Sequence, residues 1–514
     1  MKSKINSRIV KNTGFLYFRM MITMAVSLYT SRLILNILGV EDFGIYNVVA
    51  GFVMMFSVLN SSMATATQRF LAFEIGKNDL TKLRHVFSMS IIIYTLIGII
   101  IIILAESVGL WFLKTKLVIP LNRITAACTI FQFSVLTLIV NMIGIPFHAM
   151  IIAQEKMNIF AWMSIFEVCL KLFLVILLQF FDFDNLIFYS FLIFLVTVII
   201  KFCYIFYCTV NFKESRFVFY FDKSLFKTLI SYASWNLWGN FASIIMGQGI
   251  NILLNIFFGP LVNAARAISY QVKVAVNQFV LNFQMAVNPQ IIKSYAIGDL
   301  EYMHKLIFNS AKYSFFLLYI FTLPVILEAG IILEIWLGVV PDYTIIFTQL
   351  ILINILIDSI SGPLMTAAQA SGKIKVYQLV VGGLLIMNLP ISYFFLNFGF
   401  TPEITLYVSI IFSLFALYMR LKIISPLIKL NILNFTKKVL LSILAVALIS
   451  LIIPLFIKIS FKQSIARLFL IVFTSFLFSV ITIYFFGLGN KEQLFLKKKK
   501  VYFFNIIKGI KNRN

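Results

Sequence analysis

LGVEDF at residues 38–43 interrupts the apolar start of the chain, and a matching joint, FGPLVN, stands at 258–263 in the second half. Three further joints recur in the same order at similar distances. DL at 79–80 returns at 299–300, LWFL at 110–113 returns as IWLG at 335–338, and AQEK at 153–156 returns as ASGK at 370–373. Four joints in one order with nearly one offset indicate an internal repeat.

The composition is that of an integral membrane protein. Of the 514 residues, 61% are hydrophobic and 12% are charged, whereas soluble proteins have about 45–50% and about 25%. Apolar segments of about 20 residues or more can cross a hydrocarbon core of about 30 Å as helices. The predicted spans are 13–37, 43–66, 86–112, 120–145, 158–180, 185–210, 225–257, 262–288, 308–337, 343–370, 376–398, 402–428, 439–457 and 466–488.

These spans predict an all-α fold of about 14 transmembrane helices. Six form an N-terminal lobe, 1–212, and six form a C-terminal lobe, 213–430; two additional helices occupy 431–488, and a basic tail occupies 489–514. Because each lobe holds an even number of spans, its copy enters the bilayer from the same side. Parallel repeats with a substrate path between them are a transporter arrangement.

The basic residues predict the orientation, because Lys and Arg accumulate on cytoplasmic loops. One set of loops and both ends of the chain carry most of them. The opposite loops carry few: Lys114, Lys116, Arg123, Lys458, Lys462 and Arg467. Both termini are therefore predicted to be cytoplasmic.

The net charge of +24 does not point to nucleic acid in such a chain. The positive-inside bias and attraction to anionic membrane lipids explain it, and the tail with KKKK at 497–500 between aromatic residues is typical of an interfacial anchor. Docking of a partner on this tail is the alternative. The four cysteines and three histidines lack metal-ligand spacing, so no metal site or cofactor is expected.

Ionisable groups inside spans are costly and are candidates for function. In the span 262–288, five polar side chains fall within roughly 40° of one line at about 100° per residue: Arg266, Tyr270, Lys273, Asn277 and Gln284. Such a stripe cannot face lipid. It predicts either the lining of a water-filled cavity or hydrogen bonding between helices.

Neighbouring spans supply further polar groups. Asn236 and Asn240 begin a neutral polar face on 225–257, Arg19 lies deep in the first span, and Arg32 lies nearer its outer end. A cationic cavity selects an anionic substrate, and Arg suits bidentate phosphate contact. Among the acids, Glu167 has the spacing of an intrahelical pair with Lys171, which leaves Glu328 and Asp358 as the deep acids.

The motifs TSRLILNILGVEDFGIY at 30–46, QRFL at 68–71 running on to Gly76, and WLG at 336–338 with Pro341 and Tyr343 resemble those of Wzx-type O-antigen and polysaccharide flippases. These belong to the multidrug/oligosaccharidyl-lipid/polysaccharide (MOP) exporter superfamily. The related lipid II flippases use arginines in helices 1 and 8 of a cationic central cavity. By position, Arg19 and Arg266 correspond to them.

The resemblance implies a transporter in the bacterial inner membrane rather than an enzyme. It would flip an undecaprenyl-diphosphate-linked oligosaccharide, an O-antigen or capsule repeat unit, from the cytoplasmic to the periplasmic leaflet by alternating access. A coupling ion, H⁺ or Na⁺, and a polysaccharide polymerase are possible partners. The alternatives are a cation-coupled multidrug exporter and, with less support, a membrane polymerase or ligase, which would need a long outer loop that this chain lacks.

Overall fold

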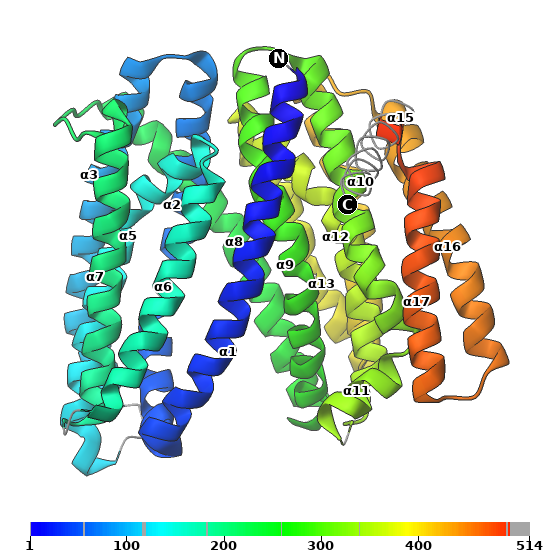
Figure 1. Ribbon diagram of the computed structural model, residues 1–514, viewed down its shortest axis with the longest axis horizontal. Helices are drawn as coiled ribbons and strands as arrows, with labels where there is room; N and C mark the ends of the chain where they lie inside the picture. Colours follow the sequence, from blue (N-terminus) through cyan, green and yellow to red (C-terminus); the bar gives the residue numbers. More distant parts are fainter. Residues whose placement is uncertain are drawn as a thin grey trace, which may run out of the picture. The chain divides into compact units, whose positions relative to one another are not determined.

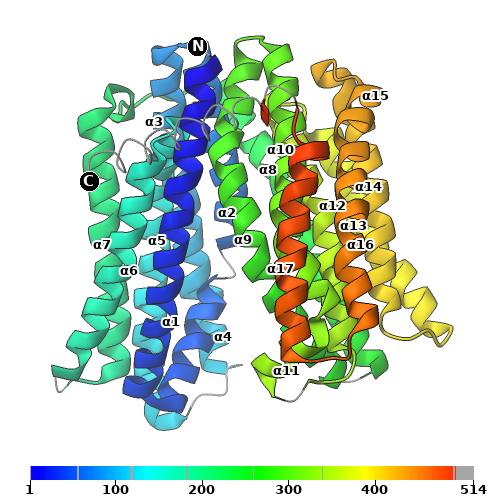
Figure 2. The same cartoon turned by 45° about the vertical axis from the view of Figure 1, so that its right-hand side comes forward.

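The computed structural model describes residues 2–54, 57–115, 120–180, 183–258, 260–338, 340–489 and 492–493, for parts of α1, α2, α8 and α9 by the backbone alone. The described residues form helices and no strand, as predicted. Figures 1 and 2 show these helices. Their bounds are α1 Lys2–Met54, α2 Ser57–Lys77, α3 Leu80–Leu104, α4 Leu110–Thr115, α5 Ile124–Ala153, α6 Met157–Leu177, α7 Asn185–Asn211, α8 Lys223–Phe258, α9 Pro260–Ala296, α10 Leu300–Leu327, α11 Ala329–Leu337, α12 Thr344–Ser371, α13 Lys375–Asn397, α14 Ile404–Ile428, α15 Ile432–Phe435, α16 Leu441–Ser460 and α17 Ile465–Thr482.

Eleven helical segments of the described chain are long and apolar enough to cross a membrane. The long helices α1, α2 and α9 lie outside this set. In α9 the predicted polar stripe lowers the hydropathy. In α1, 53 residues would extend roughly 80 Å if straight, more than twice a hydrocarbon core of about 30 Å. The helix α1 thus holds the predicted span 13–37 and the first part of the predicted span 43–66, which continues into α2.

The first joint differs from the prediction. The sequence predicts a break between spans at 38–43, whereas the backbone of α1 stays helical through these residues. A glycine inside a helix costs only about 0.5–1 kcal/mol relative to alanine, so Gly39 does not have to end it. At the matching joint, α8 ends at Phe258 and α9 begins at Pro260, where proline's missing N–H has no helical partner to lose.

Two other joints recur with the same backbone. Asn78 and Gly298 are equivalent positions of the repeat, and both have positive φ, of 57° and 77°. The next residue of each turn, Asp79 or Asp299, accepts a hydrogen bond of 3.0 Å from the backbone N–H three positions later. Each carboxylate thus caps the helix that follows. The internal repeat read from sequence is reproduced at these turns.

The chain divides into two compact units. Unit 1 comprises 1–243, 285–303 and 366–383, and unit 2 comprises 244–284, 304–365 and 384–514. Within unit 1, α5 is central, since it packs against α1, α2, α3 and α7. Within unit 2, α16 and α17 pack side by side (Figure 2). Unit 1 combines residues 1–212 with segments of the second predicted repeat, whereas unit 2 lies wholly after residue 243. The predicted lobe boundary at 212 stays a prediction.

Candidate functional site

Arg266 lies on α9 in unit 2 and is 3% exposed. Its Nη1 donates a hydrogen bond of 3.0 Å to Asn251 Oδ1 on α8, and its Nη2 donates one of 3.2 Å to the Tyr270 hydroxyl. Its Nε is buried without an acceptor among the described residues, and the ion pairs found there do not include it. A buried cation with an unused donor suits an anionic ligand.

Tyr270 lies between two cations. Arg266 Cζ is 4.9 Å from the centre of its ring, and Lys273 Nζ is 4.8 Å from it. Offsets of four and three residues place all three on one face of α9, as predicted. Because the face of an aromatic ring attracts cations, Tyr270 stabilises two positive charges that would otherwise repel each other.

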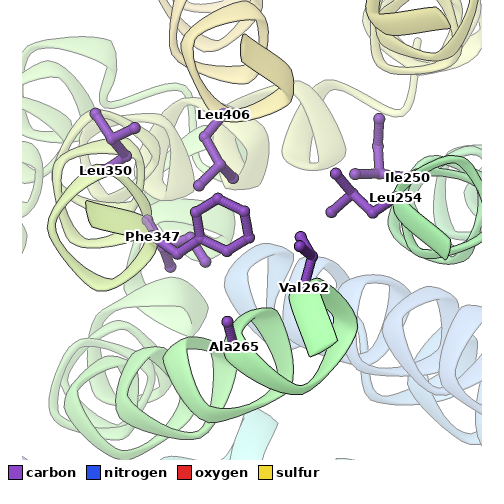
Figure 3. Close-up of a cluster of buried hydrophobic side chains, with 8 residues drawn as sticks. Ile250, Leu254, Val262, Ala265, Phe347, Leu350 and Leu406 are labelled. Carbon is purple, nitrogen blue, oxygen red and sulfur yellow. The ribbon is translucent and has the colours of Figure 1, made fainter. Parts of the chain in front are cut away.

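An apolar cluster adjoins this group in unit 2. Its members come from α8, α9, α12 and α14 (Figure 3), and Tyr270 packs against it. The cluster consists of Ile250, Leu254, Val262, Ala265, Phe347, Leu350, Ile351 and Leu406. Such surroundings have a low dielectric constant, which strengthens the attraction between Arg266 and an anion that reaches it.

The two ends of the predicted stripe on α9 differ. Gln284 donates hydrogen bonds to Ser314 Oγ on α10, 3.1 Å away, and to the Ser359 carbonyl oxygen on α12, 3.3 Å away. It therefore ties helices together. Asn277, between Lys273 and Gln284, is half-buried. Hydrogen bonding between helices accounts for the end of the polar stripe at Gln284. The part of the stripe from Arg266 to Asn277 is the remaining candidate for the lining of a site.

Asn236 and Asn240 on α8 belong to unit 1 and thus to a different unit from Arg266. Asn236 is 3% exposed, and its Oδ1 accepts a hydrogen bond of 3.1 Å from Gln378 Nε2 on α13. This is again a contact between helices. Asn240 is half-buried.

Arg19 lies half-buried on α1 in a second basic group, within unit 1. Its guanidinium is 4.7 Å from the centre of the Phe160 ring, and the His148 ring of α5 is 4.9 Å from the same ring. Lys201 of α7 lies against α5, where its side chain occupies the space in front of Gly144. The side chain of Arg32 lies outside the described part.

The acids of the spans are largely neutralised. Glu167 and Lys171 form the expected intrahelical pair at 2.6 Å. Glu328, 2% exposed, pairs with Arg467 of α17 through two N–O distances of 2.8 Å. Asp358 accepts a hydrogen bond of 3.2 Å from Asn354. Of the two deep acids in the sequence, only Asp358 is without a cationic partner among the described ion pairs.

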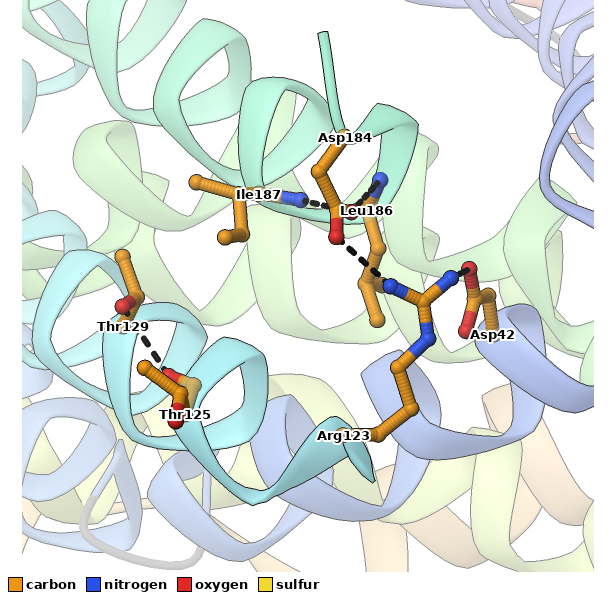
Figure 4. Close-up of polar contacts among 7 residues, drawn as sticks. All are labelled: Asp42, Arg123, Thr125, Thr129, Asp184, Leu186 and Ile187. Atoms are coloured by element: carbon orange, nitrogen blue, oxygen red, sulfur yellow. Dashed lines mark hydrogen bonds and ion pairs between the residues drawn. The ribbon is translucent and has the colours of Figure 1, made fainter. Parts of the chain in front are cut away.

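Sequence reasoning missed the role of Arg123, which it counted only as a basic residue of an outer loop. Arg123 donates hydrogen bonds of 2.6 Å to Asp42 of α1 and to Asp184, the N-cap of α7 (Figure 4). Asp184 also accepts from the backbone N–H of Leu186. Three segments far apart in sequence thus meet at one guanidinium. The acidic character of the loops at 40–42 and 181–184 was the available signal.

The comparisons with known proteins identify the fold. No protein-family model matches the chain, and no curated protein matches it. Solved structures do: a MATE structure in complex with MaD3S has a TM-score of 0.71 at 13% identity, covering 83% of this chain and 97% of that one. An outward-facing MATE family transporter of the MOP superfamily has a TM-score of 0.68 at 14% identity, covering 81% and 96%.

The chain has the MATE transporter fold. A third match is described as a MOP superfamily transporter from Pyrococcus furiosus whose binding pocket has reverse polarity, suggesting a different function; its TM-score is 0.64 at 13% identity, with coverage of 82% and 97%. These similarities confirm the predicted all-α architecture of the superfamily. At such identities they concern the fold, and the polysaccharide branch stays a prediction.

Within this MATE fold, Arg266 and Lys273 offer hydrogen-bond donors and positive charge. No group of three or more His, Cys, Asp or Glu residues among them could hold a metal ion. Arg266, Tyr270, Lys273 and Asn251 form the best-defined constellation, the cationic group of unit 2. The positive charge and the adjoining apolar cluster are suited to an anion.

Proposed function

We propose that the chain is a flippase that moves an undecaprenyl-diphosphate-linked oligosaccharide from the cytoplasmic to the periplasmic leaflet. The main support is buried Arg266, which lacks a carboxylate partner among the described ion pairs and shares Tyr270 with Lys273. A diphosphate would supply the missing negative charge, and arginine can bind it through two parallel hydrogen bonds. The lipid tail would stay in the bilayer, and no covalent bond would change.

In this proposal Arg266 and Lys273 of unit 2 attract the diphosphate, and Tyr270 and Asn277 on the same helix contact the sugars. Arg19 and Arg32 on α1 contribute further positive charge. The protein would work in the bacterial inner membrane with both termini cytoplasmic. A coupling ion, H⁺ or Na⁺, and a polysaccharide polymerase are the proposed partners. Alternating access would carry the substrate across.

A cation-coupled exporter of the MATE type is the second candidate, favoured by the fold matches, one of which is a MATE transporter in complex with Rb⁺. Such a transporter needs acids free to bind cations. Here Glu328 is paired with Arg467, which leaves Asp358 as the deep acid for that role. The electrostatics therefore favour an anionic substrate.

The test uses a flippase-deficient bacterium that carries the parent protein or its Arg19→Gln, Arg266→Gln and Lys273→Gln variants. We expect the parent to restore surface polysaccharide and each variant to restore far less at equal amounts of membrane protein. Lys462→Gln, an exposed cation in an outer loop, is the control and should export as the parent does. Resistance to cationic drugs without any surface polysaccharide would instead support the exporter.

A further inference from the structure

Arg69 is a nearly fully buried arginine of α2 that binds backbone rather than an acid. It is 6% exposed, and its Nε and Nη2 donate hydrogen bonds of 2.9 Å to the carbonyl oxygens of Gln369 and Ala370. These carbonyls belong to the last turn of α12, where helical carbonyls lack intrahelical donors. Arg69 therefore caps α12 from another helix, within unit 1.

Aromatic rings surround this guanidinium. Its Cζ lies 4.4 Å from the ring centre of Phe70, 4.9 Å from that of Phe73 and 5.6 Å from that of Tyr232 on α8. The Tyr232 hydroxyl also donates a hydrogen bond, of 3.5 Å, to the Gln369 carbonyl oxygen. The rings exclude water and hold the cation against the end of α12.

Glu155, in the turn between α5 and α6, makes the complementary contact. Its carboxylate accepts hydrogen bonds from Gln290 and Lys293, both on α9 and within unit 1. Glu155 is 9% exposed, and its backbone carbonyl accepts a further hydrogen bond, of 3.2 Å, from Asn12 of α1.

The two contacts are related by the internal repeat. When the two copies are aligned at their joints, Lys293 corresponds to Phe73, and Gly372 corresponds to Glu155. Gly372 adjoins Arg69, since a Cβ on it would lie 2.9 Å from Arg69 Nη2. Glu155 and Gly372 share a positive φ, 60° and 75°. The turn at Glu155 therefore binds Lys293 of the second repeat through its carboxylate. The turn at Gly372 adjoins Arg69 of the first repeat, which binds the carbonyl oxygens of Gln369 and Ala370.

A residue between the two contacts marks the symmetry axis. A Cβ on Gly76 would lie 2.9 Å from Ala296 Cβ and 2.9 Å from Lys293 Cα. Ala296 corresponds to Gly76 in the same alignment of the copies, so two equivalent positions of the repeat touch each other. Contact of a position with its own equivalent is the signature of a two-fold interface. The ends of α2 and α9 meet on this axis.

We propose that these contacts are a pair of symmetric latches that close the transport path at the end that the charge bias assigns to the cytoplasm. The first latch is Arg69 with the carbonyl oxygens of Gln369 and Ala370, and the second is Glu155 with Gln290 and Lys293. Each latch joins a segment before residue 212 to one after it. In alternating access, both latches have to break together when this end opens. The proposal does not depend on the lipid-linked oligosaccharide, because any substrate has to pass the two latches.

The test measures opening directly, without substrate. All four native cysteines are replaced by alanine, and Ala72→Cys is introduced on α2, where Ala72 is 0% exposed between Arg69 and Gly76. A membrane-impermeant maleimide is applied to the cytoplasmic side of membrane vesicles. We expect slow labelling in the parent, and labelling faster by roughly tenfold after Glu155→Gln or Arg69→Gln, since each change removes hydrogen bonds to a charged group.

Two further experiments distinguish the loss of a latch from a general loss of stability. One reverses the charges of Glu155 and Lys293, and the other breaks a comparable ion pair elsewhere in unit 1. Glu155→Lys should speed labelling, and adding Lys293→Glu should return it toward the parent rate. Glu167→Gln breaks another Glu–Lys pair of unit 1, on α6, and should leave labelling unchanged. Unchanged labelling in the Arg69→Gln/Glu155→Gln double variant, or equal acceleration by Glu167→Gln, would overturn the proposal. Neither outcome depends on which substrate is transported.

Discussion

Tyr270 has two separable roles at the scale of a single residue. Its hydroxyl accepts a hydrogen bond from Arg266, and its ring lies against both Arg266 and Lys273. The hydroxyl orients one guanidinium, whereas the ring offsets the repulsion between two cations. A sequence periodicity places the three residues on one face, but it does not distinguish a ring between two cations from three independent side chains.

Replacing Tyr270 should therefore give graded results. We expect Tyr270→Phe to retain most export, because the ring remains, and Tyr270→Ala to lose much more, because cation–π contacts contribute about 0.5–2 kcal/mol each. Surface polysaccharide, normalised to the protein in the membrane, is the measurement. Equal loss in both variants would assign the role to the hydroxyl instead.

At the scale of elements, the bounds of several later spans could be predicted closely, whereas the joint within α1 and the contacts between helices could not. The predicted span 376–398 became α13, Lys375–Asn397, and 402–428 became α14, Ile404–Ile428, because apolar length and Gly or Pro joints determine such bounds. The contacts between helices could not be predicted in this way. From its position on the stripe, Gln284 could line a cavity or form hydrogen bonds between helices. It binds α10 and α12, and no periodicity within α9 decides between the two.

The turn after α12 provides a test with an internal control. Gly372 has φ of 75°, and a Cβ there would meet Arg69 Nη2, whereas Gly399 has φ of 84° with open space around it. Both Gly→Ala changes incur the left-handed backbone strain of about 1–2 kcal/mol. Only Gly372→Ala also displaces Arg69.

Thermal unfolding in detergent should therefore show a larger fall in midpoint for Gly372→Ala than for Gly399→Ala. Gly372→Ala should also speed maleimide labelling of Ala72→Cys, whereas Gly399→Ala should not. Equal behaviour of the two variants in both measurements would mean that Arg69 accommodates the methyl group without losing its carbonyl contacts.

At the scale of the whole molecule, membrane class, all-α fold and internal repeat follow from the sequence, because they depend on composition and on spacing along the chain. The pairing of Arg123 with two carboxylates and of Glu328 with Arg467 does not. Such pairs join segments separated by 61 to 139 positions. A single sequence records which charges exist but not which of them meet.

The predicted topology has a direct test. Both ends of the chain should be cytoplasmic, because Lys and Arg residues concentrate on the loops that face the same side as the termini. A reporter fused after Asn514 should show cytoplasmic activity, and one inserted after Asp184 should show periplasmic activity. Periplasmic activity of the terminal fusion would require an odd number of crossings.

The contact between Gly76 and Ala296 also constrains how the two copies of the repeat can diverge. Most positions of a duplicated sequence drift independently, since each copy has its own neighbours. Here one copy is the other's neighbour, and the space available to a side chain at 76 is limited by the side chain at 296 and by the backbone of Lys293. A side chain at 76 would meet both the backbone and the side chains of the other copy, so descendants of the duplication would keep the small residues at 76 and 296 together.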